Sequence, residues 1–211
     1  MCFSEKASIF SFLVGMFGSI LCISLGKPED KITGYFFAFV SVMQLIEFLL
    51  WRHQKCDLYN RVLSLTGMVF NHLQPIVLAG VILYFSKTMR NAPLFYFILL
   101  LYLIVIIPYS IQFIIKPRYQ CTLKYNADHL KWQWNSLKYA GIVYIIFLIT
   151  IFSFSVIGMP NLKYGIFLAF FGAISYLLSF YFYIGHVGAL WCYFVVFYPI
   201  CYYLYKKILN N

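Results

Sequence analysis

Charged residues are scarce in this chain of 211 residues, of which only 10% are Asp, Glu, Lys or Arg. A soluble domain usually carries about 25% charged residues. Hydrophobic residues make up 63% of the sequence, so the composition excludes an ordinary soluble domain and indicates an integral membrane protein. Acidic residues are the scarcest class, with six Asp and Glu against 16 Lys and Arg.

Several catalytic motifs are also missing. The sequence contains no Walker loop, no GxSxG nucleophile elbow and no dinucleotide fingerprint. It has no HxxxH, HExxH or CxxC pair, which weakens any metal-site assignment. No lysine lies at the middle of an apolar run, which argues against a retinal Schiff base. Whether the protein is an enzyme, and which cofactor it would use, stays open at this level.

Seven apolar runs are present instead, each about 20 residues long and sufficient to cross a bilayer as a helix. They cover residues 7–26, 33–52, 62–85, 93–115, 138–158, 163–184 and 187–205. The first run lacks a small-residue cleavage pattern, so we expect a span rather than a signal peptide. The prediction is an all-α, multi-pass bundle of about seven transmembrane helices in a single domain, residues 1–211; which membrane holds it is not determined.

Small residues recur at intervals of three and four in the first and sixth spans. They are Ser4, Ser8, Ser11, Gly15, Gly18 and Cys22 in the first, and Gly165, Ala169, Gly172, Ser175 and Ser179 in the sixth. Such a face lets a neighbouring helix approach closely, so we expect two packing seams. At the start of the first span, Ser4 is positioned to cap the helix and Phe3 to pack back onto it.

Polar residues inside the second and third spans form the main candidate site. Glu47, in QLIEFLLW, is the only acid within the seven runs as drawn, and ionisable groups in spans are usually functional. In NHLQP, Pro75 should disturb the helix near mid-membrane and free the carbonyl of Asn71. The predicted pocket for a proton or solute consists of Gln44, Glu47, Trp51, Asn71, His72 and Gln74. The alternative is that these side chains only join helices by hydrogen bonds.

Seven spans place the N-terminus and the loops after the second, fourth and sixth spans on one face. All four tryptophans, three of the four histidines and Cys2, Cys56, Cys121 and Cys192 lie near it. That face carries nine of the 16 Lys and Arg, so the positive-inside rule slightly favours a cytoplasmic N-terminus. If the face is instead extracytoplasmic, Cys56 and Cys121 are able to form a disulfide.

A metal site on the same face is a second hypothesis. His53 and Cys56 are separated by two residues in HQKC, and His129 and His186 lie in other loops of that face. Nitrogen and sulfur ligands of this kind suit zinc or another transition metal. The segment 126–134, NADHLKWQW, is amphipathic enough to lie on the membrane surface and cover the pocket, or to serve only as an anchor.

The sequences MCFSEKAS, QLIEFLLW with RHQKCD, NHLQP and ALWC together resemble an uncharacterised family of small multi-pass membrane proteins. Its members begin with Met-Cys-Phe-Ser and occur in bacteria and in large DNA viruses. The resemblance implies the fold and no activity. Abundant Phe, Tyr, Ile, Lys and Asn are typical of AT-rich genomes, which fits a viral or organellar source.

Three functions follow as hypotheses. The leading one is a channel or transporter for a proton, cation or small polar solute, with Glu47 as the titrating group and His72 as a relay. The others are a membrane-embedded metal-dependent enzyme or redox protein, and a structural protein of a membrane or virion. The expected partner is the lipid bilayer, with oligomeric state open, and no nucleic acid, because the basic residues sit at span ends where they anchor helices.

Overall fold

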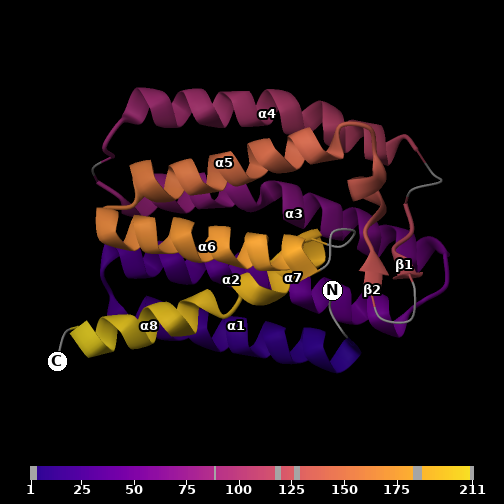
Figure 1. The fold of residues 1–211 in the computed structure, drawn as a ribbon, viewed down its shortest axis with the longest axis horizontal. Helices are drawn as coiled ribbons and strands as arrows, with labels where there is room; N and C mark the ends of the chain where they lie inside the picture. The colour runs from indigo at the N-terminus through magenta and orange to yellow at the C-terminus, as the bar shows by residue number, and fades with distance from the viewer. Residues whose placement is uncertain (1–3, 88, 117–119, 126–128, 183–186, 210–211) are drawn as a thin grey trace.

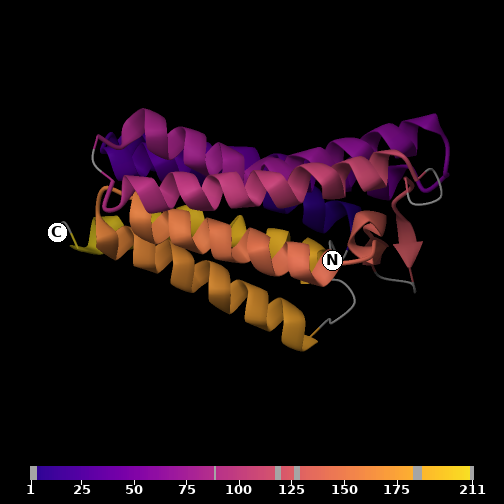
Figure 2. The ribbon, with the colours of Figure 1, turned by 90° about the horizontal axis from the view of Figure 1, so that it is seen from above.

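Six long apolar helices dominate the computed structural model, which describes residues 4–87, 89–116, 120–125, 129–182 and 187–209 (Figure 1). They are α1 (Glu5–Leu25), α2 (Pro28–Arg52), α3 (Leu58–Phe85), α4 (Ala92–Ile114), α5 (Ala140–Gly158) and α6 (Leu162–Phe182). All six are long and apolar enough to cross a membrane. Figure 2 shows α3 and α4 on one side of the bundle and α6 on the other, with α5 between them. The predicted all-α membrane bundle is confirmed.

The seventh predicted span, 187–205, differs from expectation, because it is divided into α7 (Val187–Val195) and α8 (Tyr198–Leu209). Pro199 lies in the first turn of α8, where its missing N–H is tolerated, whereas a helix continuing from α7 would lose a hydrogen bond there. The Cys22 thiol of α1 donates to the Pro199 carbonyl at 3.2 Å. Together α7 and α8 still run the length of the bundle, so the two termini lie at opposite ends (Figure 1).

The predicted packing seams are present. On α1 the side facing the bundle consists of Ser8, Ser11, Gly15, Gly18 and Cys22, all buried. A Cβ atom on Gly15 would lie 2.2 Å from Ser41 Oγ of α2, and one on Gly165 of α6 would lie 2.2 Å from the Ser155 carbonyl oxygen of α5. These backbones are therefore too close for any larger residue.

The start of α1 also agrees with the prediction made for Ser4. Its side-chain oxygen accepts a hydrogen bond from Ala7 N at 3.2 Å, as an N-cap residue should. The packing predicted for Phe3 and the place of Cys2 lie outside the described residues.

The segment between α4 and α5 folds into a cap, defined here as residues 120–125 and 129–137. It contains an antiparallel hairpin, β1 (Leu123–Tyr125) with β2 (His129–Lys131), and a short 3-10 helix, η2 (Gln133–Ser136). Trp132 and Trp134 are only 3% and 1% exposed and stack with ring centroids 4.8 Å apart. The prediction of a surface-lying segment is thus wrong for the described part, because both indoles turn inward and cover the helix ends.

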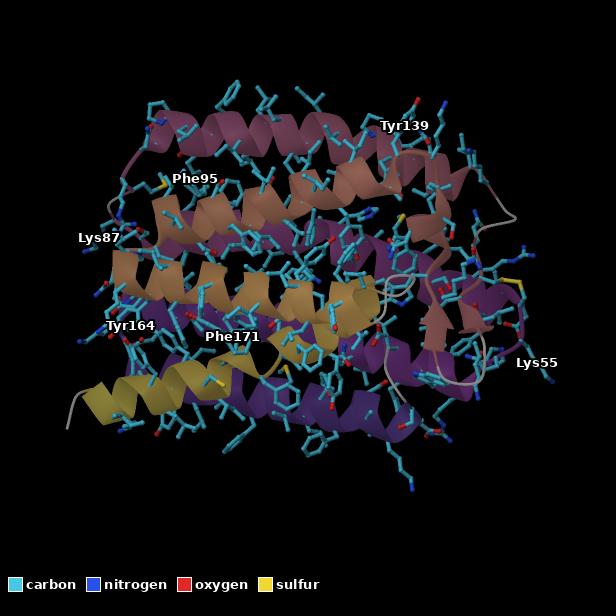
Figure 3. All side chains as sticks on the ribbon, viewed as in Figure 1. Lys55, Lys87, Phe95, Tyr139, Tyr164 and Phe171 are labelled. Carbon is cyan, nitrogen blue, oxygen red and sulfur yellow. A yellow bond between two sulfur atoms is a disulfide. The ribbon has the colours of Figure 1, made fainter. Side chains whose placement is uncertain are left out.

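Hydrogen bonds and a disulfide hold the cap on the bundle end that also carries the start of α1 and the α2–α3 turn. We call this the cap end; Lys55 marks it in Figure 3. Asn60 of α3 accepts from Thr122 N and donates to Thr122 O, both at 3.0 Å. Gln54 Oε1 accepts from Lys124 N at 2.6 Å, and the Tyr109 hydroxyl donates to the Trp134 carbonyl. A disulfide joins Cys56 to Cys121.

Candidate functional site

A buried polar stripe runs along α2, the most enclosed helix. In α2, 61% of the most apolar stretch is buried, against 44% or less in the other five spans. Its polar residues lie three or four positions apart, hence on one side of the helix, except where Phe37 interrupts them. They are Asp30, Thr33, Ser41, Gln44 and Glu47, each no more than 1% exposed. The predicted pocket residues Gln44 and Glu47 thus belong to a stripe that extends from one end of the bundle toward the other.

Glu47 lies in the half of this stripe nearer the cap and is fully buried. Gln44 Nε2 donates to Glu47 Oε2 at 3.2 Å. The Glu47 carboxylate is close enough to the Cys192 thiol of α7 to interact with it electrostatically. Gln74 of α3 contacts the same thiol. In the part of the chain that the structure describes, neither polar atom of the Gln74 amide has a nitrogen or oxygen hydrogen-bond partner. Three helices therefore bring polar groups together around one carboxyl.

A second polar group adjoins the first around α3 and α5. Asn71 and His72 line a small cavity with Asn135 of the cap and Tyr144 of α5. The Tyr144 hydroxyl lies beside both asparagine side chains and is electrostatically coupled to Cys192. Tyr144 and Cys192 therefore link the surroundings of Glu47 to those of Asn71, and Asn135 extends the polar groups into the cap.

The hydrogen bonds of His72 define which of its nitrogens carries the proton. Ser110 Oγ donates to the Ile106 carbonyl at 2.7 Å, so its single proton is already engaged. His72 Nδ1, 2.8 Å from the same oxygen, must therefore be the donor. In the neutral ring Nε2 is then an acceptor, available to take a proton. The structure gives His72 a partner on α4 rather than Glu47, so the predicted relay does not contact the predicted titrating group directly.

A backbone carbonyl near Pro75 has a partner on α4. The Tyr102 hydroxyl donates to the His72 carbonyl at 2.6 Å. The carbonyl that Pro75 leaves without its helical donor is that of Asn71, and the partner expected for it stays a prediction. A polar side chain from an adjacent helix thus stabilises the proline-containing turn, as membrane helices require.

The enclosed cavities are small. The one lined by Gln74, Trp191 and Phe171 has a volume of about 20 Å³ open to the centre of a water molecule, and that beside Asn71 and His72 has about 10 Å³ (Figure 3 marks Phe171). Each volume suits about one water molecule. Among the described residues neither of these two spaces has room for an organic solute.

The structure shows the surroundings of two of the four tryptophans. Trp51 is half-buried beneath the cap, with Lys124 Nζ 5.8 Å from its ring centre, and does not line the small cavities. Trp191 lies inside the bundle and donates from Nε1 to the Gly172 carbonyl at 3.0 Å, so it is not an interfacial residue.

The predicted metal ligands do not assemble in the described part of the chain. Cys56 is bonded to Cys121 and offers no thiolate, which removes it from the set. His53 Nε2 lies 2.7 Å from Asp57 Oδ2. The His129 side chain and His186 lie outside the described residues. Among the described residues no three His, Cys, Asp or Glu side chains lie close enough together to hold a metal ion. A metal held by the histidines therefore remains a prediction.

The opposite end contains a charged cluster that the sequence pattern does not predict. The apolar runs leave Glu29 and Asp30 between the first two spans, but α2 begins at Pro28, so Glu47 is not the only acid in a span. Proline followed by two acids is a helix-start signal that identifies this boundary. Lys206 of α8 lies against both carboxylates, and Tyr202 donates to Asp30.

Comparison with known proteins gives no match to a family model, a curated protein or a solved structure. The resemblance based on the opening MCFS and the three internal motifs therefore stays a prediction, and function is argued from the site alone.

Proposed function

We propose that this protein transfers protons within the membrane, with Glu47 as the group that binds and releases them. The observation that carries the proposal is a fully buried carboxyl on a buried polar stripe; its neighbour Cys192 contacts Gln74, which lines a cavity of single-water size. Ionisable side chains are costly in a span and typically mark proton or ion pathways. A proton needs only such a relay, whereas a metal cation needs several oxygen ligands.

Polar groups support a route from Glu47 toward the cap. Cys192 adjoins the carboxyl, Gln74 and Tyr144 adjoin Cys192, and Asn71 and Asn135 adjoin Tyr144. A hydroxyl or a thiol can both donate and accept a proton, and an amide can hold and orient a water between such groups. His72, with Nε2 as acceptor, lines the cavity beside Asn71 and serves as a side branch of this route.

The disulfide supports an extracytoplasmic cap end. Disulfides persist in oxidising compartments and are rare where glutathione keeps thiols reduced. The count of nine basic residues against seven is too close to equality to outweigh it. In this orientation the Asn135 side of the route opens away from the cytoplasm.

The test is proton flux in liposomes that contain the purified protein and a trapped pH dye, with the membrane potential set by potassium and valinomycin. Glu47→Gln keeps the size and the Gln44 contact but removes the titrating group. We expect flux to fall by about 100-fold, the lower range of what a positioned acid–base group contributes. Glu5→Gln, an exposed acid at the start of α1, is the matched control.

Two results would contradict the proposal. Wild-type flux equal to that of empty liposomes would exclude transfer across the membrane. Flux unchanged in Glu47→Gln, with the fold intact, would mean that the polar stripe only joins helices.

A further inference from the structure

At the end opposite the cap, a charged cluster is enclosed between α2 and α8, beside Tyr164 of α6 (Figure 3). Lys206 is 2% exposed; its Nζ lies 3.1 Å from Glu29 Oε1 and also contacts Asp30 Oδ1. The Tyr202 hydroxyl donates to Asp30 Oδ1 at 2.6 Å. Cys22 of α1 also interacts electrostatically with the cluster.

The charges in this cluster do not balance. Two carboxylates face one ammonium, so the fully ionised cluster has a formal charge of −1. Its titratable neighbours Tyr164, Tyr202 and Cys22 carry no positive charge in either protonation state. Lys27, just before α2, contributes its backbone N–H to Asp30 Oδ2 at 3.1 Å. A buried unbalanced charge is costly, and one added proton removes it.

Hydrogen bonds distinguish the two carboxyl groups. Asp30 accepts from three donors, on Lys206, Tyr202 and the Lys27 backbone. Within the described residues Glu29 accepts only from Lys206, and its side chain is 10% exposed against 1% for Asp30. Glu29 is therefore both the less satisfied carboxylate and the one in reach of water.

Two buried hydroxyls lie between this cluster and Glu47. Thr33 is one helical turn from Asp30 on the same stripe, and Tyr198 is one turn from Tyr202 with its ring 4.9 Å from Phe37, the apolar interruption of the stripe. Both side chains are 0% exposed, and within the described ranges neither Thr33 Oγ1 nor the Tyr198 hydroxyl has a hydrogen-bond partner. Buried hydroxyls normally have a hydrogen-bond partner in the protein or an ordered water.

We propose that Glu29 is a second proton-binding residue, through which protons exchange with the aqueous phase at the end opposite the cap. Asp30, Lys206 and Tyr202 are positioning residues that hold a fixed ion pair beside it. The proposal rests on proton transfer at Glu47 and extends that function along α2 over roughly 27 Å, the rise over the 18 residues from Glu29 to Glu47.

Glu29→Gln tests it without dismantling the cluster. The amide oxygen can still accept from Lys206, the Asp30–Lys206 pair stays, and the formal charge becomes zero. We expect thermal stability equal to or above that of the wild type, with proton flux in liposomes reduced at least about tenfold, a substantial part of a general acid–base contribution. A purely structural role predicts no change in flux. Glu5→Gln again serves as control.

Infrared difference spectra on a pH change provide a readout independent of flux. One informative result is a protonated-carboxyl band that is absent in Glu29→Gln and present in Glu47→Gln. This result supports Glu29 as a proton-binding residue even if neither the wild type nor any variant conducts protons. If flux disappears in Glu47→Gln but persists in Glu29→Gln with the band retained, the second site is wrong and the proposed function stands. If the wild type conducts no protons and the band is unaffected by Glu29→Gln, both fail.

Discussion

The two ends of the bundle are closed by different chemistry. At the cap end, neutral groups and a disulfide fasten a folded segment, with Asn60 bonded to both backbone groups of Thr122. At the other end, α8 is fastened by the buried charges of Lys206, Glu29 and Asp30. Neutral hydrogen bonds can be exchanged for bonds to water at little net cost, whereas a separated buried charge cannot. The cap is therefore fastened by separate bonds that can be lost one at a time, whereas α8 depends on a set of buried charges that must stay together.

Removing the cation of the α8 end should give the largest effect. Lys206→Met leaves two buried carboxylates without their ammonium, and breaking a buried pair in this way costs about 3–5 kcal/mol. Unfolding in a fixed detergent measures the loss. Lys207→Met removes the exposed neighbour and should stay within about 0.5 kcal/mol of the wild type. Equal losses in the two variants would show that the ion cluster does not hold α8.

Opening the disulfide at the cap end should have an intermediate effect. Cys56→Ser with Cys121→Ser is expected to cost about 2 kcal/mol, at the lower end of typical disulfide losses, because Asn60, Gln54 and Tyr109 still hold the cap. Hydrogen exchange should become faster in the cap and stay unchanged in α8. Cys201→Ser, at an exposed free cysteine, is the control. Faster exchange in α8 as well would contradict the independence of the two ends.

Acid should produce the smallest effect, again at the cap end. The hydrogen bond from the Asn60 backbone N–H, and then that of His53, lowers the pKa of Asp57 below its ordinary value of 3.8. A lowered pKa stabilises the fold above that ordinary value, and the contribution is lost as the pH falls through the folded-state pKa. The melting temperature of the wild type should exceed that of Asp57→Asn near neutral pH, with the difference shrinking below about pH 4. A constant difference would argue against this bond.

The sequence predicts the helix bundle more completely than it predicts the candidate functional site. Apolar runs and small-residue intervals are local signals, so six spans and the seam of α1 could be predicted. Glu47 and Gln44 were found because polar residues stand out in an apolar run. The pairing of Lys206 with Asp30 joins residues 176 positions apart, and no local pattern indicates it. Likewise, the amphipathic segment that ends in Trp134 fits either a membrane surface or a buried cap, and only tertiary packing decides.

The division of the last crossing bears on how the protein is made. A helix needs about 20 apolar residues to enter a bilayer unaided, yet α7 has 9 residues, and α8 has 12 and ends with two lysines. Neither α7 nor α8 is long and apolar enough to move from the translocon into the bilayer by itself. Because α1 and α2 are synthesised first, they precede α8 in the membrane. Cys22 of α1 can then contact Pro199 at the start of α8, and Asp30 of α2 can pair with Lys206. The C-terminal segment should therefore join the membrane last, after translation has produced the site that receives it.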